Sequence, residues 1–266
     1  MPRLAANLTM MYGELDFPER FDAAAASGFK AVEFLSPYDH PAGEIAARAR
    51  QAGVEIVLFN AAIGDWAAGE RGLGALPERV EDCRRAIDRA IAYAIELKCP
   101  ALHLMAGKTG PGTGPEAAKD TLISNVEYAA RNAASSGIEI ALEPINTRVD
   151  IPGYFYATCA EALSVIDAVG LANVRLQYDI YHMQIMEGDL ARSIERLLPR
   201  IGHIQIADNP GRHEPGTGEI NFEWLLPRLD QLGYRGWVGC EYSPRAGTTE
   251  GLSWAEPYLS QDGVRT

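Results

Sequence analysis

The sequence predicts an α/β protein built as a single closed (β/α)8 barrel, a TIM barrel, over residues 1–266. Short apolar runs alternate with longer amphipathic runs along the whole chain, which implies parallel strands joined by helical crossovers. Eight such units fill about 250 residues, the usual length of this barrel. An open doubly wound sheet is the alternative, but the turn after the first strand, TMMYGELDF, holds one glycine instead of a glycine-rich motif.

Each unit has a recognisable strand and, in most cases, a helix. The strands are expected at 4–10, 31–35, 55–61, 101–107, 138–145, 174–180, 202–208 and 237–243. The helices are expected at 16–27, 41–52, 77–98, 115–136, 158–169, 189–199 and 221–232. The clearest helix, 77–98, carries one apolar stripe of Val80, Cys83, Ile87, Ile91, Ala94 and Ile95. Asp16, Thr158 and Asn221 are expected to cap helix N-termini, while Gly28, Gly53, Gly137, Gly170 and Gly233 end helices.

Composition excludes several classes of protein. The chain has a formal net charge of −12 and a pI near 4.9, which argues against binding to a nucleic acid backbone. The N-terminus has no signal-peptide pattern, and no apolar run is long enough to cross a bilayer. The four cysteines are scattered without metal-site spacing, so they are expected to be reduced and buried. We therefore expect a cytoplasmic protein that binds neither nucleic acid nor membrane.

Four polar residues end consecutive apolar strands in the second half of the chain: Glu143, Asp179, Gln205 and Glu241. Active sites of these barrels lie at the C-terminal ends of the strands. Strand alternation turns Glu143 and Gln205 inward and places Leu142, Ile204 and Ile206 toward the helices. Three carboxylates and an amide brought together would suit a hard divalent cation. This pattern predicts a metal-assisted enzyme.

Loop residues supply candidates for substrate binding. His182 follows Asp179 by three positions, and Arg212, in the loop 207–222, suits a substrate carboxylate. Trp66 and Arg71 are expected to form part of a lid.

Two residues of the fourth unit, Lys108 and His103, are expected to have different roles. Lys108 is a further candidate for substrate binding, although Gly107-Lys108-Thr109 lacks the leading glycine of a phosphate-binding loop. His103, inside the fourth strand, is expected to fill the barrel core.

Nearly the whole chain resembles the hydroxypyruvate isomerase family, within the xylose-isomerase-like barrel superfamily that also includes ketose 3-epimerases. The segments that carry the resemblance are FNAAIGDWAAGERGLGALP (59–77), LEPINTRVDIPGYF (142–155), QYDIYHMQIMEGDL (177–190), HIQIADNPGRHEPGTGEINF (203–222) and GCEYSP (239–244).

The resemblance implies that Glu143 and Glu241 transfer protons, and that both glutamates, Asp179 and Gln205 bind Mg²⁺ or Mn²⁺. Related epimerases commonly have a histidine at the position of Gln205. The implied reaction interconverts hydroxypyruvate and tartronate semialdehyde through an enediolate, so the expected partner is a small 2-oxo or hydroxy acid. A homo-oligomer is compatible with the sequence, which does not decide the oligomeric state.

Several alternatives stay open on this scaffold. A 2-oxo-tetronate isomerase or a ketose 3-epimerase would keep the same site and differ in substrate. A non-catalytic sugar-acid-binding barrel would keep the fold and lack turnover. A metal-dependent abasic-site nuclease is disfavoured, because such sites use many histidines and this chain has five histidines and a net charge of −12.

Overall fold

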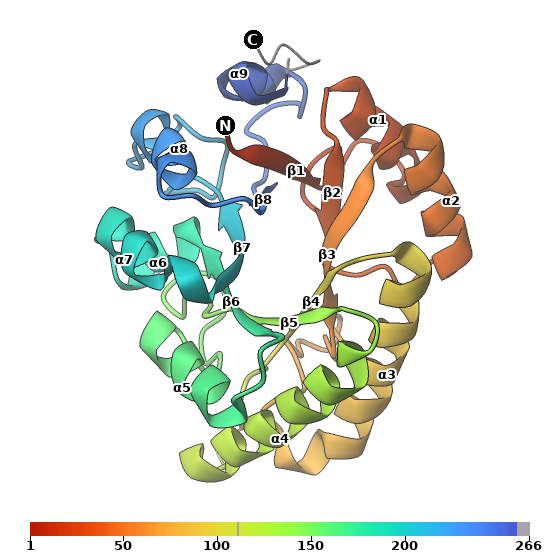
Figure 1. Cartoon of the computed structure of the whole chain (residues 1–266), viewed down its shortest axis with the longest axis vertical. Helices are drawn as coiled ribbons and strands as arrows, with labels where there is room; N and C mark the ends of the chain where they lie inside the picture. The colour runs from red at the N-terminus through yellow and green to blue at the C-terminus, as the bar shows by residue number, and fades with distance from the viewer. Residues whose placement is uncertain (111, 260–266) are drawn as a thin grey trace.

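The computed structural model describes residues 1–110 and 112–259, and its centre is a closed barrel of eight parallel strands in the order β1 to β8 (Figure 1). Each strand pairs with the next in the chain, and β8 closes the ring on β1. The strands are β1 Arg3–Asn7, β2 Ala31–Phe34, β3 Glu55–Ala61, β4 Ala101–Leu104, β5 Glu139–Leu142, β6 Val174–Asp179, β7 Ile201–Ile206 and β8 Trp237–Cys240. The predicted (β/α)8 barrel is confirmed.

Helices surround the barrel (Figure 1). They are α1 Arg20–Ala26, α2 Ala42–Ala52, α3 Val80–Leu97, α4 Pro115–Ala134, α5 Cys159–Val169, α6 Ile180–Met186, α7 Leu190–Leu197, α8 Phe222–Gln231 and α9 Glu256–Leu259. Two of them, α6 and α9, were not predicted. The α6 helix starts directly after β6, where the sequence gives no break between strand and helix. None of the helices in the described ranges is both long and apolar enough to cross a membrane.

Most strands end earlier in the structure than the sequence predicted. The predicted strand 101–107, for example, ends at Leu104, and Ala106 instead forms an isolated antiparallel bridge with Gly72. The chain leaves the barrel at these points to form the loops of the mouth. Apolar residues continue into those loops because they are buried there as well, so hydrophobicity alone does not mark the end of a strand.

Two details of the helix predictions need correction. The Asp16 side chain makes no capping hydrogen bond, because a 3₁₀ turn, Phe17–Glu19, precedes α1. Ile95 is 54% exposed although the sequence placed it on the buried stripe of α3. By contrast, Thr158 forms a capping box with Glu161, and Asn221 accepts a hydrogen bond from the Trp224 amide.

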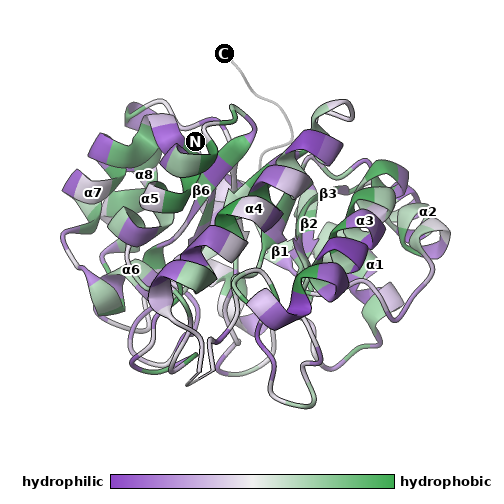
Figure 2. Cartoon of the chain, turned by 90° about the horizontal axis from the view of Figure 1, so that it is seen from below, coloured by the Kyte–Doolittle hydropathy of each residue, from purple (hydrophilic) through white to green (hydrophobic). Residues whose placement is uncertain are grey.

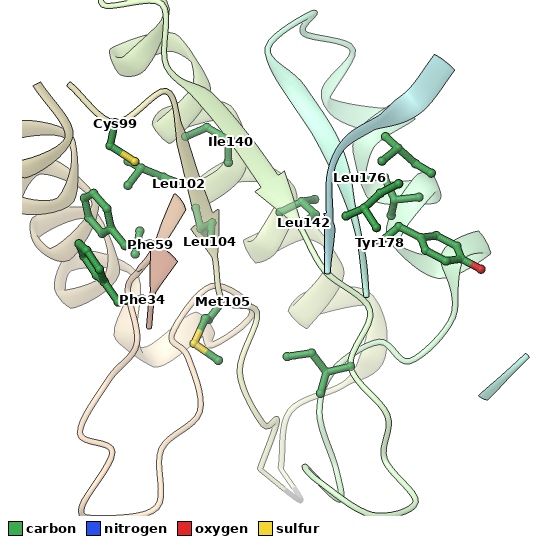
Figure 3. Close-up of a cluster of buried hydrophobic side chains, with 14 of the residues drawn as sticks. Phe34, Phe59, Cys99, Leu102, Leu104, Met105, Ile140, Leu142, Leu176 and Tyr178 are labelled. Atoms are coloured by element: carbon green, nitrogen blue, oxygen red, sulfur yellow. The ribbon is translucent and has the colours of Figure 1, made fainter. Parts of the chain in front are cut away.

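The main apolar core lies between the strands and the helices. Outward-facing residues such as Leu142, Ile204 and Ile206 belong to this core, as predicted. Figure 3 shows part of it, with Leu102 and Leu142 among the side chains from neighbouring strands. In Figure 2 the helices carry hydrophobic and hydrophilic residues in alternation, as expected of helices with one face toward a barrel.

The inside of the barrel changes from apolar to polar toward the mouth. Ala5, Ala31 and Val57 form a small separate apolar cluster near the starts of β1, β2 and β3. Two positions further along β1 and β2, Asn7 and Glu33 are buried polar residues. Because side chains alternate along a strand, both point inward like the alanines before them. A buried polar layer therefore separates the apolar cluster from the mouth.

Candidate active site

The four polar residues predicted to end strands β5–β8 are all buried at the mouth of the barrel. Asp179 on β6 is the register partner of Gln205 on β7, and Gln205 is in turn the partner of Gly239, two positions before Glu241. One carboxylate oxygen of Glu143, one of Asp179 and one ring nitrogen of His182 all lie within 4.8 Å of one another. The guanidinium of Arg212 links Asp179 to Glu241.

Two carboxylate oxygens of this cluster lack hydrogen-bond partners. They are Glu143 Oε1 and Asp179 Oδ2. The other oxygen of Asp179 accepts hydrogen bonds from the backbone amides of Tyr181 (2.7 Å) and His182 (3.4 Å), because Asp179 caps α6. A buried carboxylate oxygen without a partner is costly. The two unpaired oxygens therefore fit a divalent cation, and a nitrogen of His182 lies within 4.8 Å of this pair of carboxylates.

Arg212 lies among three carboxylates. Its Nη2 donates to Glu241 Oε1 at 2.8 Å and is 3.7 Å from Asp179 Oδ2, while its Nη1 donates to Asp150 Oδ1 at 3.1 Å. The loop holds the residue at a φ of 56°, with the Ser243 amide donating to the Arg212 carbonyl. Its buried Nε has no partner. The sequence prediction placed Arg212 near the substrate, and the structure brings it into the carboxylate cluster.

Burial shifts the pKa values of the carboxyl groups upward. Burial is the main cause of the raised pKa of Glu143, and the nearby charges of Glu241 and Asp179 raise it further. Burial also raises the pKa of Glu241 to about 8 and that of Asp179 to about 6, even though Arg212 acts in the opposite direction on both. Carboxyl groups with such pKa values can take up and release protons near neutral pH.

The hydrogen bonds of Asn146 define the tautomer of His182. The Asn146 Oδ1 accepts from the backbone amides of Val149 and Asp150, so its Nδ2 is the end that lies 2.8 Å from His182 Nδ1. His182 Nδ1 must then accept this hydrogen bond. Burial, with a smaller contribution from the charge of Arg212, lowers the pKa of His182, so the ring is neutral and carries its proton on Nε2.

The protonated nitrogen of His182 faces the carboxylates. It lies 3.6 Å from Asp179 Oδ2 and 3.9 Å from Glu143 Oε1. A neutral N–H donates and cannot bind a cation. In this tautomer His182 can donate a hydrogen bond to an oxygen atom and is not a cation ligand.

Sequence reasoning missed several polar residues that support the cluster from within the barrel. His103, expected only to fill the core, places Nδ1 3.4 Å from Glu143 Oε2, and burial lowers its pKa to about 3. Gln177 hydrogen-bonds with Gln205, and Glu33 contacts both Gln205 and His203. Strand alternation could have indicated Gln177 and His203, which stand two positions before Asp179 and Gln205.

The other predicted substrate-binding residues lie on loops of the mouth. Trp66 is 44% exposed, and the Arg71 guanidinium stacks on its ring at 3.9 Å. Lys108 is exposed, and its backbone forms a bridge with Tyr154. The structure does not bring these three residues into the carboxylate cluster.

A large cavity lies among the loops that follow β1, β2 and β3. Its volume is about 770 Å³, and its lining includes Thr9, Ser36, Asn60 and Trp66. These residues come from the ends of β1, β2 and β3 and the loops that follow them. The lining of the cavity includes none of the clustered carboxylates, which follow or end strands β5, β6 and β8.

Comparisons with known proteins agree with this fold. The sequence profile of the xylose isomerase-like TIM barrel family matches residues 21–258. A 2-oxo-tetronate isomerase of Cupriavidus necator is 51% identical over 98% of this chain and 100% of its own length. The hydroxypyruvate isomerase of Escherichia coli is 45% identical over 97% of this chain and 100% of its own. A crystal structure described as an AP endonuclease, family 2, from Brucella melitensis is 48% identical with a TM-score of 0.95, covering 97% and 100% of the two chains.

A closed parallel barrel with buried carboxylates at the C-terminal ends of its strands is typical of (β/α)8-barrel enzymes. The matches show that the chain belongs to the xylose isomerase-like TIM barrel family, in the branch that contains hydroxypyruvate isomerases and 2-oxo-tetronate isomerases. It is an isomerase of the aldose–ketose type.

Proposed function

We propose that the protein interconverts hydroxypyruvate and tartronate semialdehyde, with Glu143 and Glu241 as the proton-transferring residues and with a divalent cation, Mg²⁺ or Mn²⁺. The observation that carries the proposal is the buried set of Glu143, Asp179 and Glu241, in which Arg212 contacts Asp179 and Glu241 and two carboxylate oxygens are unpaired. The hydroxypyruvate isomerase of Escherichia coli, at 45% identity, supports the substrate class.

The two glutamates suit a reaction that moves a proton between neighbouring carbon atoms. Such a proton is weakly acidic, so a base must remove it and an acid must return it to the adjacent carbon of the enediolate. Burial raises the pKa of Glu143 well above its usual value and raises that of Glu241 to about 8, so both carboxyl groups hold a proton more readily than exposed glutamates do. Their burial also keeps water from exchanging the transferred proton.

Two further residues would bind the oxygen atoms of the substrate. His182 directs its Nε2 proton into the cluster and would donate to a substrate hydroxyl or carbonyl oxygen. Arg212 has an unpaired Nε and would bind the substrate carboxylate. Trp66, Arg71 and Lys108 would contact the substrate only from the loops around the mouth.

Glu143, Asp179, Gln205 and Glu241 would hold the cation. The unpaired oxygens of Glu143 and Asp179 provide two ligands, and the amide oxygen of Gln205 and the carboxylate of Glu241 complete an all-oxygen set. The bound cation would polarise the substrate carbonyl and stabilise the negative charge that develops as the proton leaves.

The test is turnover by metal-stripped protein before and after addition of Mg²⁺ or Mn²⁺. Hydroxypyruvate, a four-carbon 2-oxo acid and D-fructose serve as parallel substrates. We expect metal-restored activity that is greatest on hydroxypyruvate. Preference for the four-carbon acid, as the name of the Cupriavidus relative suggests, would keep the chemistry and change the substrate. Absence of turnover on all three would contradict the proposal.

An endonuclease function, as the name of the Brucella structure would suggest, has less support. Two histidines, His103 and His182, contact the carboxylate cluster, which is few for a nuclease site with many histidine ligands, and the Nε2 proton of His182 prevents it from binding a cation. The chain also carries a net charge of −12, which repels a phosphate backbone. Cleavage of a duplex that contains an abasic site, in the same metal-restored assay, would overturn this preference.

A further inference from the structure

Glu33 is a buried carboxylate on β2 that lies beneath the candidate cation site. It accepts three hydrogen bonds: Oε1 from Asn7 Nδ2 (3.0 Å) and Gln205 Nε2 (2.8 Å), and Oε2 from His203 Nε2 (2.7 Å). The side chain is 1% exposed. The contacts with β7 cross the inside of the barrel, because β2 and β7 are not adjacent strands.

The two ends of the Gln205 amide face different surroundings. Its nitrogen donates to Glu33, and its oxygen accepts from Gln177 Nε2. The Gln177 amide also reaches the carboxylate of Glu143. The oxygen of Gln205 is therefore on the side of the predicted ligands, and the nitrogen is on the side of Glu33.

The charge of Glu33 determines this orientation. A carboxylate has no hydrogen atom to donate, so only the NH₂ end of the amide can approach Glu33 favourably. An inverted amide would place two acceptor oxygens in contact within a buried site, which is strongly unfavourable. The amide oxygen keeps a second lone pair after it accepts from Gln177.

The backbone of β8 leaves room for the Glu33 carboxylate. A Cβ atom at Gly239 would lie 2.2 Å from Glu33 Oε2 and 2.4 Å from Oε1. Any larger residue at this position would push the carboxylate away from Gln205.

We propose that Glu33 is a positioning residue that turns the amide oxygen of Gln205 toward the divalent cation. This inference rests on the proposed function, because it takes Gln205 as a cation ligand. Glu33 acts through Gln205 and does not touch substrate. Residues that orient metal ligands in this way typically change metal affinity by about 10- to 100-fold when they are replaced.

The test is a double-mutant cycle in Mn²⁺ affinity, measured by the electron paramagnetic resonance signal of free Mn²⁺. Its variants are Glu33→Gln, Gln205→Leu and the combination of both. Glutamine at position 33 can present either an oxygen or an NH₂ group, so Gln205 is no longer held in one orientation. We expect Glu33→Gln to weaken Mn²⁺ binding about tenfold when Gln205 is present. The Gln205→Leu variant has no amide to orient, so adding Glu33→Gln to it should weaken Mn²⁺ binding about twofold or less.

The controls separate positioning from other effects. Loss of the Glu33 charge and any general loosening of the barrel act in both backgrounds and therefore cancel in the cycle. Glu214→Gln is the matched control, since Glu214 is also buried and accepts a hydrogen bond from the Arg245 amide. Each variant is also checked by its melting temperature.

Two results would overturn this inference and leave the proposed function intact. The first is an unchanged Mn²⁺ affinity in Glu33→Gln. The second is that Glu33→Gln weakens Mn²⁺ binding by the same factor with and without Gln205→Leu. Failure of the unaltered protein to bind Mn²⁺ would overturn the proposed function and this inference together.

Discussion

At the scale of single residues, Glu143 after β5 and Glu241 after β8 are both buried and both have raised pKa values. Replacing either by glutamine preserves shape and removes the ability to transfer a proton. We expect Glu143→Gln and Glu241→Gln each to lower kcat by about 10²- to 10⁴-fold. Steady-state kinetics with saturating metal would measure this, with circular dichroism to confirm the fold. Activity within about tenfold of the unaltered protein would refute the assignment.

The same carboxyl groups predict how stability depends on pH without metal. Burial raises the pKa of Asp179 from 3.8 to about 6 and that of Glu241 from 4.5 to about 8. The folded state therefore binds more protons than the unfolded state over this range. The stability that these groups contribute is fully present below about pH 4 and is lost as pH rises through about 6 and 8.

Urea unfolding of metal-stripped protein between pH 5 and 9 would measure this dependence. Glu241→Gln removes one of the titrating groups, so its free energy of unfolding should fall less steeply with pH than that of the unaltered protein. Identical slopes for the two proteins would show that Glu241 does not titrate in this range.

Individual residues also show what the sequence could reveal about the site. Glu143, Asp179, Gln205 and Glu241 were predictable because each ends an apolar strand, where barrels place their active sites. Glu33 was not, because it lies within its strand and its partner His203 is 170 positions away. That contact exists only once the barrel has closed.

At the scale of elements, the Glu33 carboxylate on β2 fits against β8 only because Gly239 has no side chain. Gly239→Ala would place a methyl group against the Glu33 carboxylate, although the φ of Gly239 is not in the left-handed region. We expect this substitution to cost about 1–3 kcal/mol of stability, as for other overpacked interiors. Urea denaturation would measure it. Gly13→Ala, at a site with open space and no positive φ, is the matched control and should change stability far less.

The elements themselves were mostly predictable, with clear exceptions. Apolar periodicity located the strands and every described α-helix except α6 and α9, and the capping motif at Thr158 marked the start of α5. The α6 helix was missed because Asp179 serves both as the last residue of β6 and as the helix cap. The exposed position of Ile95 was missed because apolar periodicity identifies the buried face of a helix but does not show which residues at the border of that face are exposed.

At the scale of the whole molecule, a cation bound among strands of the second half of the barrel should stabilise the complete fold. A ligand that binds only the folded state adds about 2.7 kcal/mol at 100 times its Kd. For a domain of this size we expect the melting temperature to rise by about 5–10 °C.

Differential scanning calorimetry with Mg²⁺ or Mn²⁺ would measure the rise, and EDTA should reverse it. Asp179→Asn removes a negative charge that faces the cluster and serves as the control. A rise of equal size in that variant would indicate that the cation binds elsewhere.

The two halves of the barrel mouth differ in what they contain. The residues proposed for proton transfer and cation binding come from β5 to β8, whereas the 770 Å³ cavity is lined from β1 to β3 and the loops that follow. Mutations in the first three loops can therefore alter the size and polarity of that cavity without replacing a carboxylate of the cluster. Such a layout is evolvable: the loops around the cavity can vary under selection while the residues proposed for acid–base chemistry are inherited unchanged.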